Sequence, residues 1–464
     1  MKNYQLTIIG GGPAGMSCAL AAKKAGIQDI LLLERRNFLG GILRQCIHDG
    51  FGLLSCGSSL TGPEFARSLE CRVRETDITI ETGCFVSEIN YEQSPFCIEY
   101  LSSNGTLCKC TSSALVIATG CREKPFGSLR IPGTRPSGIY SAGTAQYMMN
   151  VQNILPGKTA VILGLGDIGM IMARRLTLEG ARVKMILGLE MTGLPRNFQR
   201  CIKDFDIPYA QNYTVVSVHG QKRLKGVTIA PLDDNKEPVL SEKKYLACDT
   251  LLVAAGLVPE KDLCPSCPTK GVFLCGNVDE IYSLVDYVVE EGEYTGLSAA
   301  SYLLGSTPET ELALKNLNRK RADRENEISS ISTEDDIICC GCPRSCSLHV
   351  EIKETDQGSE ILVSGNTCGF GEKYARSEFE SKKRILTTTV KVKGDTLRLL
   401  PVRSSDALPL QKYEEAMQLI RKLEVEPDIP NGTVLIKNIL RTGADIIVTQ
   451  CDFQTPKESC RFPL

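Results

Sequence analysis

Six glycines, in two groups of three, have the spacing in this chain that points most clearly to chemistry. Each group follows an apolar run that predicts a buried strand; the groups are Gly10, Gly12 and Gly15 after residues 6–9, and Gly164, Gly166 and Gly169 after residues 160–163. In the pattern G-x-G-x-x-G, the glycines allow a tight turn and let backbone amides approach a pyrophosphate. The helix that follows offers free N–H groups and the positive end of its dipole. Two such turns predict two dinucleotides on one chain, which is typical of a flavin and a nicotinamide.

The elements around the first turn predict a nucleotide-binding unit. A small-residue helix follows the turn, and a second apolar strand then stops at Glu34, 19 residues beyond Gly15. A carboxylate at that strand end suits the hydroxyls of an adenosine ribose. Alternating segments over 78–110 predict further strands. The unit closes with an apolar strand that runs into Ala118, Thr119 and Gly120.

The second unit repeats this order in a smaller form. Its last apolar run, 251–255, ends at Gly256, much as the first unit ends at Gly120. Residues 271–305 return to the first unit, with a strand that ends at Gly276 and Asn277. The sequence therefore predicts an α/β fold of two interleaved Rossmann-like domains, followed by a small α+β cysteine-rich domain. The predicted boundaries are 1–144 with 259–305, then 145–258, a polar linker over 306–336, and 337–464.

Composition excludes several other classes. The chain has 464 residues, which suits about three domains, and its net charge of −2 offers no basic field for nucleic acid. No apolar run approaches the ~18 residues of a membrane helix. Residues 1–3 lead directly into the first strand, so we expect no export signal. Most of the 21 cysteines are scattered singly, which favours free thiols in a reducing cytoplasm.

Together these motifs, in this order over residues 1–305, resemble the pyridine nucleotide–disulfide oxidoreductase family in its short form, as in thioredoxin reductase. The resemblance implies that Gly10, Gly12 and Gly15 hold the FAD pyrophosphate and Glu34 the ribose. It places Val86 beside the adenine, and Gly276 with Asn277 near the ribityl chain and phosphate. The other FAD-binding residues that it implies are Pro13, Ala14, Arg35, Gly41, Ala118, Thr119 and Gly120. For NAD(P)H it implies Gly164, Gly166, Asp167, Ile168, Gly169 and Gly256.

Two positions depart from the family pattern. Asn277 replaces the usual aspartate, which removes a charge near the flavin while keeping a hydrogen-bonding group. Gly188 stands where NAD-binding members often carry an acid, Glu190 follows two residues later, and no basic pair follows to bind a 2′-phosphate. The choice between NAD and NADP stays open and leans to NAD.

The segment 40–52, GGILRQCIHDGFG, resembles flavoprotein subunits of multi-subunit amine, opine and glycerol-3-phosphate dehydrogenases. Cys46 in this segment has no closely spaced partner cysteine, so dithiol chemistry is poorly supported. Two interpretations of Cys46 remain. It is either a catalytic thiol whose pKa is lowered by His48 and helix dipoles, or a small residue that lines the flavin pocket.

A cysteine cluster marks the C-terminal domain. Omitting Cys340, the spacing is C-x2-C-x3-C-x21-C, formed by Cys339, Cys342, Cys346 and Cys368. Three thiolates on one loop and a distant fourth are typical of an iron–sulfur cluster, and the segment resembles the [4Fe–4S] domain of molybdopterin oxidoreductases. Structural zinc is the rival interpretation. Residues 385–464 resemble only a small uncharacterised domain that accompanies such flavoproteins.

These expectations combine into one function. The chain is expected to exchange hydride with NAD(P)(H) through FAD and to relay electrons through a [4Fe–4S] cluster to or from a partner subunit, glycerol-3-phosphate dehydrogenase-like by analogy. One alternative is a stand-alone NAD(P)H oxidase or thiol/disulfide reductase that uses Cys46. Another is that the C-terminal domain is a zinc-bound docking module.

Overall fold

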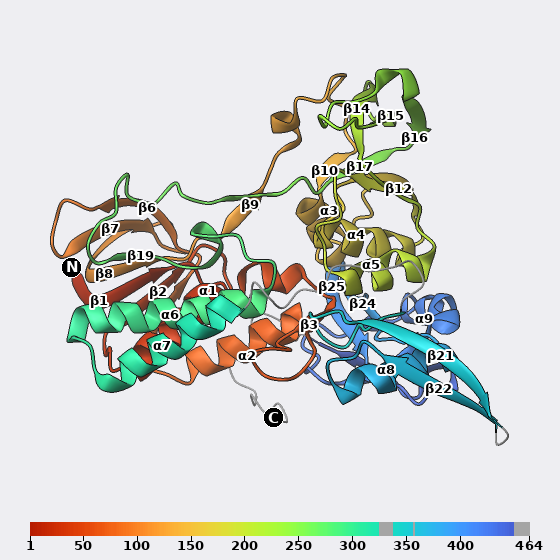
Figure 1. Cartoon of the computed structure of the whole chain (residues 1–464). Helices are drawn as coiled ribbons and strands as arrows, with labels where there is room; N and C mark the ends of the chain where they lie inside the picture. Colours follow the sequence, from red (N-terminus) through yellow and green to blue (C-terminus); the bar gives the residue numbers. More distant parts are fainter. Residues whose placement is uncertain (324–336, 356–357, 450–464) are drawn as a thin grey trace. The chain divides into compact units, whose positions relative to one another are not determined.

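The computed structural model describes residues 1–323, 337–355 and 358–449, which fold into two compact units (Figure 1). The first unit is built from Met1–Arg122, the described part of Leu257–Glu325, and Thr449. The second contains Glu123–Gly256 and the described part of Asn326–Val448. Where the chain passes from one unit to the other and back, β9 (Cys121–Glu123) pairs with β18 (Leu257–Pro259).

The first unit has a central sheet whose strand order is β5-β2-β1-β8-β7-β6, with β19 also paired to β8. Its parallel strands are β1 (Lys2–Ile9), β2 (Ile30–Glu34), β5 (Thr79–Thr82), β8 (Leu107–Ile117) and β19 (Val272–Leu274). The antiparallel extension is made by β6 (Phe85–Asn90) and β7 (Phe96–Leu101), and a small ribbon by β3 (Asp49–Phe51) and β4 (Leu60–Thr61). A strand that pairs in parallel needs a crossover connection, and helices α1 (Pro13–Lys24) and α2 (Gly62–Arg74) lie in these connections.

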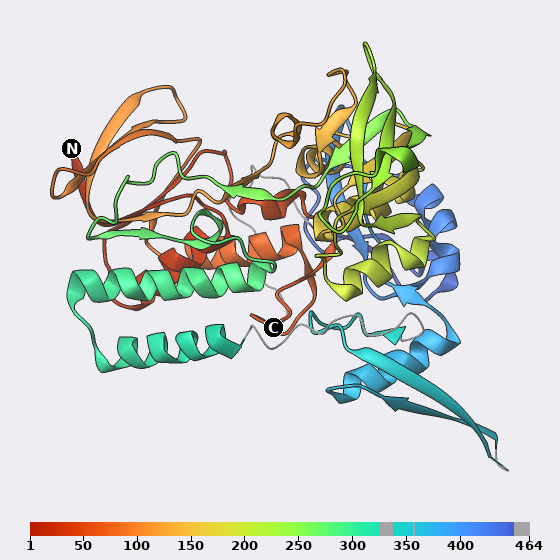
Figure 2. The same cartoon turned by 45° about the horizontal axis from the view of Figure 1, so that its top comes forward.

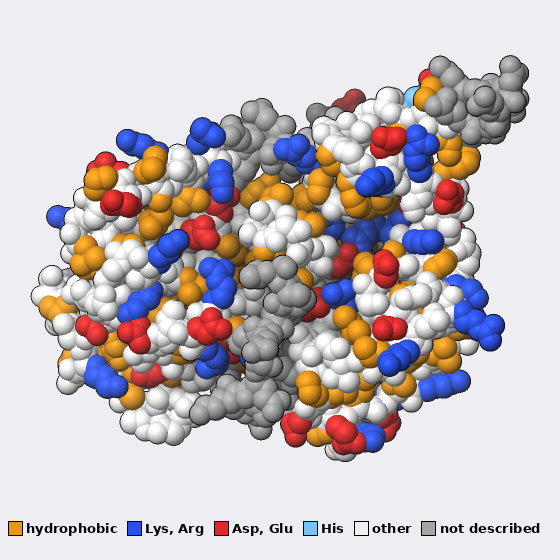
Figure 3. Space-filling model, turned by 90° about the horizontal axis from the view of Figure 1, so that it is seen from below, with side chains coloured by type: hydrophobic (Ala, Val, Ile, Leu, Met, Phe, Trp, Pro, Cys, Tyr) orange, Lys and Arg blue, Asp and Glu red, His pale blue; other side chains and the backbone are white. Residues whose placement is uncertain are grey.

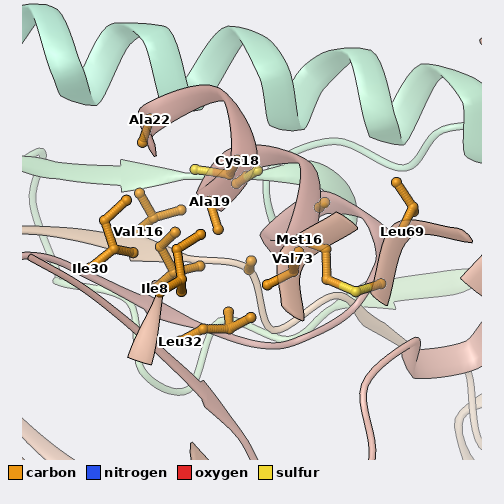
Figure 4. Close-up of a cluster of buried hydrophobic side chains, with 14 of the residues drawn as sticks. Ile8, Met16, Cys18, Ala19, Ala22, Ile30, Leu32, Leu69, Val73 and Val116 are labelled. Carbon is orange, nitrogen blue, oxygen red and sulfur yellow. The ribbon is translucent and has the colours of Figure 1, made fainter. Parts of the chain in front are cut away.

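The core of this unit lies between the sheet and its helices. Figure 4 shows strand residues such as Ile8, Leu32 and Val116 beside Met16 and Ala19 of α1. All of these side chains are completely buried, and burying each large one contributes about 1.5–3 kcal/mol. The core therefore fixes the loop between β1 and α1, where the first glycine turn lies.

Two further helices belong to the first unit, α6 (Val285–Leu304) and α7 (Pro308–Asp323), and both are visible in Figure 2. The prediction of a linker over 306–336 is wrong for its first half, because α7 occupies it. Polar composition suggested a linker, but Leu317 is buried and Arg321 pairs with the buried Glu291 of α6 at 3.1 Å. The second half of the predicted linker, 324–336, lies outside the described residues.

The second unit begins with a parallel five-stranded sheet of order β10-β17-β11-β12-β13. The strands are β10 (Ile139–Ser141), β11 (Thr159–Leu163), β12 (Arg182–Gly188), β13 (Tyr209–Gln211) and β17 (Thr250–Val253), with α3 (Ala142–Asn150), α4 (Asp167–Leu178) and α5 (Pro195–Cys201). An antiparallel sheet adds β14 (Tyr213–Gly220), β15 (Leu224–Pro231) and β16 (Lys244–Ala247). The predicted boundary at residue 144 needs correction, because β10 and α3 belong to this sheet and the unit starts at Glu123.

The C-terminal region of this unit has two parts. The first contains the cysteines and consists of β20 (Ile337–Ile338), β21 (Ser347–Thr355), β22 (Gly358–Ser364) and α8 (Gly369–Glu380). The second is a five-stranded sheet made of β24 (Thr387–Val392), β25 (Asp395–Ser404), β27 (Glu424–Val425), β28 (Val434–Ile436) and β29 (Ile446–Val448), together with α9 (Tyr413–Ile420). A short pair, β23 (Lys383–Arg384) with β26 (Leu408–Pro409), joins the two parts. These elements form an α+β region within the second unit, and the last part of the domain predicted over 337–464, residues 450–464, lies outside the described residues.

The surface is mixed in charge. Figure 3 shows a face on which basic and acidic side chains are interspersed. Among the residues that the structure describes, no helix has both the length and the apolar character that crossing a membrane requires.

Candidate dinucleotide sites and cysteine loop

The first glycine turn, residues 10–15, is packed so closely that two of its glycines admit no side chain. A Cβ on Gly10, whose φ is 117°, would lie 2.3 Å from the carbonyl oxygen of Ala118. A Cβ on Gly15 would lie 1.9 Å from the carbonyl oxygen of Gly10. Gly12 differs, because a Cβ there would meet no protein atom within 4 Å. The turn is therefore closely packed on its protein side and open at Gly12.

Helix α1 starts at this opening. Its N-cap is Gly12, which makes no side-chain capping bond, and Pro13 takes the first helical position. The first turn of a helix leaves backbone N–H groups without intrahelical partners, so the amides of Ala14 and Gly15 face the place where a pyrophosphate would bind. Gly40 donates its N–H to the Gly11 carbonyl at 2.8 Å, which holds Gly41 next to Gly12. The cradle suits the pyrophosphate of a dinucleotide.

Glu34 is held ready at the end of β2. Its buried carboxylate accepts hydrogen bonds from the N–H of Gly11 at 2.8 Å and of Arg36 at 2.7 Å. The Glu34 carbonyl accepts from the N–H of Cys84, which leads into β6, where Val86 is buried. The predicted ribose and adenine residues are thus neighbours, whereas Arg35 is exposed.

Strand β19, late in the chain, pairs with β8 and leads back to the first glycine turn. Cys275 donates its N–H to the carbonyl of Ile117, and a Cβ on Gly276 would lie 2.7 Å from Cβ of Ala14. Asn277 also has protein partners: its Oδ1 accepts from the Tyr282 N–H at 3.2 Å and its Nδ2 lies 3.5 Å from Sγ of Cys121. Asn277 is therefore oriented by the protein itself, a role that the sequence did not suggest.

Asp286, in the first turn of α6, is a buried carboxylate that sequence analysis missed. Its Oδ1 accepts from the N–H groups of Leu54 and Ser55 and from the Ser55 hydroxyl, and its Oδ2 accepts from the Gly52 N–H. It thereby fixes the loop that follows the Cys46 segment. The partners are more than 230 residues apart in sequence, so no local pattern reveals the contact.

The second glycine turn, residues 164–169, repeats the packing of the first. A Cβ on Gly164 would lie 2.2 Å from the carbonyl oxygen of Ala254, and one on Gly169 would lie 2.2 Å from the carbonyl oxygen of Gly164. Gly166, the counterpart of Gly12, has only the Thr192 hydroxyl oxygen within 4 Å of its Cβ position. The sequence prediction of an architectural repeat is confirmed at the level of single atoms.

Two residues of this turn that were predicted to bind the nucleotide contact other protein groups instead. Asp167 begins α4, and its Oδ1 accepts from the Leu194 N–H and from Nδ2 of Asn197, both at 2.8 Å. Burial raises the pKa of Asp167, and the hydrogen bonds oppose that shift. Ile168 packs against the core behind the turn. Gly256, with a φ of 100°, closes the last strand and accepts at its carbonyl from the Lys124 N–H.

Of the two interpretations of Cys46, the one with a lowered pKa finds no support in its surroundings. Burial raises the pKa of this thiol to about 12. The His48 ring lies against Phe51, with ring centroids 4.9 Å apart. A thiol is nucleophilic as the thiolate, and this environment disfavours the thiolate at neutral pH.

Replacing Cys46 with Ser is expected to preserve at least about half of the NAD(P)H-dependent reduction of an artificial acceptor, because the wild-type thiol is neutral at pH 7. Alkylation of Cys46 by iodoacetamide should be slow at pH 8 and accelerate as the pH rises. Steady-state assays and peptide mass spectrometry measure both. Loss of turnover in the serine variant, with FAD still bound, would contradict this expectation.

The cysteine loop, residues 339–346, brings several thiols into one region. Cys339 and Cys346 are buried beside Leu348, and burial together with the neighbouring thiols raises the pKa of Cys339 to about 11. Sγ of Cys346 lies 3.0 Å from Oγ1 of Thr367. The next residue, Cys368, is exposed and forms the N-cap of α8. Cys340 points elsewhere, toward the Arg196 carbonyl of α5.

Within the described residues, no three or more His, Cys, Asp or Glu side chains are arranged to hold a metal ion. The predicted ligands Cys339, Cys342, Cys346 and Cys368 therefore do not fit a metal as they are placed.

Comparisons with known proteins match the part of the chain that contains both glycine turns. A family model described as pyridine nucleotide-disulphide oxidoreductase matches residues 4–286, and a model described as a protein of unknown function, DUF1667, matches residues 370–450. Hydrogen cyanide synthase subunit HcnB of Pseudomonas protegens is 26% identical over 278 residues, 55% of this chain and 57% of that protein. The chain thus spans little more than half of the length of the HcnB proteins that it matches.

A thioredoxin reductase of Streptomyces clavuligerus is 24% identical over 66% of this chain and 96% of its own length. Among solved structures, the thioredoxin reductase of T. acidophilum superposes with a TM-score of 0.52 at 22% identity, covering 65% of this chain and 99% of that one. The structural likeness supports the α/β fold. The family match covers more than half of the chain. FAD and NAD(P) are the cofactors of this family. The chain belongs to the pyridine nucleotide-disulphide oxidoreductase family, whose members are flavin-dependent oxidoreductases.

Proposed function

We propose that this protein exchanges hydride with NAD(P)(H) at FAD and passes electrons to or from a second dehydrogenase subunit. The observation that carries the proposal is the pair of glycine turns, which share the same close contacts and are each open at the middle glycine. One turn lies in each unit. FAD, when bound, supplies the chemistry that links two-electron hydride exchange to one-electron transfer.

The chain's own residues bind and orient the cofactors. We assign Ala14 and Gly15 to the FAD pyrophosphate and the prearranged Glu34 carboxylate to the ribose hydroxyls, with Gly276 and Asn277 near the ribityl chain. In the second unit, we assign the amides around Gly166 to the nicotinamide dinucleotide. Because the backbone at Gly10 and Gly15 is packed too closely to admit a Cβ, we expect these donors to be held in place before the cofactor arrives, which reduces the entropic cost of binding.

Two relatives support the proposal of a partner protein. HcnB is named as a subunit of hydrogen cyanide synthase, and a protein of Agrobacterium tumefaciens that is named as one of the subunits of opine oxidase is 24% identical over 188 residues. A glycerol-3-phosphate dehydrogenase-like partner rests on the resemblance of the Cys46 segment. The iron–sulfur cluster remains a prediction from the spacing of Cys339, Cys342, Cys346 and Cys368, and we derive no electron-transfer step through it.

The alternative of a thiol/disulfide reductase finds no support in the Cys46 environment, where burial raises the pKa to about 12. The alternative of a zinc-bound docking module in the C-terminal domain stays a proposal. This domain shares a buried interface with the NAD(P)-binding part of its own unit, where Arg384 bridges Asp204 and Glu378. A docking function toward a partner would use its remaining surface.

Anaerobic titration of the purified holoprotein with NADH and with NADPH tests the proposal. We expect flavin bleaching with both reductants, and half-reduction at a lower concentration of NADH than of NADPH, because no basic pair follows β12 to bind a 2′-phosphate. Analysis for iron, zinc and acid-labile sulfide on the same sample tests the cluster. A protein that carries no flavin and cannot be reconstituted with FAD would refute the proposed function.

A further inference from the structure

We infer that the C-terminal domain, including the part matched as a protein of unknown function, is a positioning element of the nicotinamide site, acting through helix α5 on Asp167. The inference relies on the nucleotide site of the second unit and is independent of whether the cysteines bind a cluster. All of its contacts lie within that unit.

Helix α5 is attached to the second glycine turn at its first residues. The Asp167 carboxylate at the start of α4 accepts from the Leu194 N–H and from Asn197 Nδ2. Gly193, just before the helix, packs so closely on α4 that a Cβ there would lie 2.9 Å from the Asp167 nitrogen. The position of α5 therefore sets the wall beside the amides assigned to the pyrophosphate.

The same end of α5 is attached to the cysteine loop. Its N-cap is Leu194, an apolar residue that makes no capping bond, so a helix amide is left to be satisfied from elsewhere. The Arg196 N–H donates to Oγ of Ser345, 149 residues away and 1% exposed. The C-terminal domain thus supplies the missing cap.

Ser345 is held in a conformation that needs support. Its φ is 53°, in the left-handed region that costs energy for residues other than glycine. Its hydroxyl donates to the Pro343 carbonyl at 3.1 Å while it accepts from Arg196. Cys340 in the same loop donates to the Arg196 carbonyl at 3.8 Å. Two residues of the loop therefore contact one residue of α5.

The far end of α5 is fixed as well. Asp204 follows the helix, and both of its oxygens accept from Arg384 of the C-terminal domain, at 2.7 and 3.2 Å. Gln199 of α5 donates to the same Asp204 carboxylate at 2.8 Å. A helix of two turns held at both ends by another domain moves with that domain, which gives the coupling a physical route.

The first experiment compares Ser345→Ala with Ser404→Ala. Ser404 is an equally buried serine of the same domain whose hydroxyl also accepts from a backbone amide, that of Leu386, without touching α5. We expect Ser345→Ala to weaken binding of NADH, measured by its fluorescence, about 10-fold, with kcat changed less than KM. Ser404→Ala should lower thermal stability and leave the affinity within about twofold of the wild type. Equal losses of affinity in both variants, or none in either, would overturn the inference.

Two further readouts separate positioning from general destabilisation. Asn197→Ala should weaken NADH binding to a similar extent, and combining it with Ser345→Ala should add little, because both act on one contact path. Saturating NAD⁺ should slow alkylation of Cys340 several-fold, by reciprocity of coupled sites, and leave the exposed Cys267 unchanged. Additive losses together with unaltered Cys340 alkylation would refute the coupling. If these variants keep a normal FAD content and are reduced by dithionite, a failure of the coupling inference leaves the proposed function intact.

Discussion

Gly12→Ala is expected to yield a folded protein that has lost most of its affinity for FAD. A Cβ at Gly12 meets no protein atom within 4 Å, and the φ of −76° is one that alanine adopts freely. The fold therefore tolerates the methyl group. It would instead occupy the space assigned to the FAD pyrophosphate, at a cost of about 1–3 kcal/mol. This corresponds to a roughly 5- to 150-fold weaker affinity, measured by flavin fluorescence during reconstitution of the apoprotein.

The neighbouring glycines cannot serve this purpose. Alanine at Gly15 would collide with the Gly10 carbonyl at 1.9 Å, so a colourless protein would only report a damaged turn. Gly127→Ala is the matched control, because its Cβ also meets nothing within 4 Å and no cofactor is assigned there. Retention of wild-type FAD affinity by Gly12→Ala would place the pyrophosphate elsewhere.

The sequence predicted the glycine turns well because their geometry depends on residues close together along the chain. Gly10, Gly12 and Gly15 must have this spacing for one loop to turn into a helix, and the same local rule applies to Gly164. The expected strands and the end of β2 at Glu34 were likewise visible as apolar runs. The α/β class followed from their order.

Long-range contacts were beyond the sequence. Asp286 holds a loop more than 230 residues away, and Ser345 caps a helix 149 residues away. Neither has a local motif. The low hydrophobicity of residues 308–323 concealed helix α7, which is held by Leu317 and by the Arg321–Glu291 pair. The direction of the Cys46 pKa shift depended on burial, which a single sequence does not report.

Arg384→Met is expected to destabilise the second unit more than any other single change considered above. The Arg384 guanidinium, 4% exposed, donates to Asp204 and to Glu378, whose side chains are 0% and 7% exposed. Removing the cation leaves two carboxylates buried without it, and breaking a buried pair in this way costs about 3–5 kcal/mol. For a unit of this size we expect the melting temperature to fall by roughly 10 °C.

A double-mutant cycle tests the origin of that loss. Adding Asp204→Asn to Arg384→Met removes one of the stranded charges and should recover part of the stability, whereas Asp204→Asn alone should destabilise. Lys393→Met provides a matched control, since Lys393 pairs with Glu426 at 2.5 Å on the surface of the same domain and such pairs contribute little. If the melting temperatures of Arg384→Met and Lys393→Met both equal that of the wild type, Arg384 does not hold the C-terminal domain to α5. If only Arg384→Met melts early and also binds NADH weakly, the domain interface and the nicotinamide site depend on the same contacts.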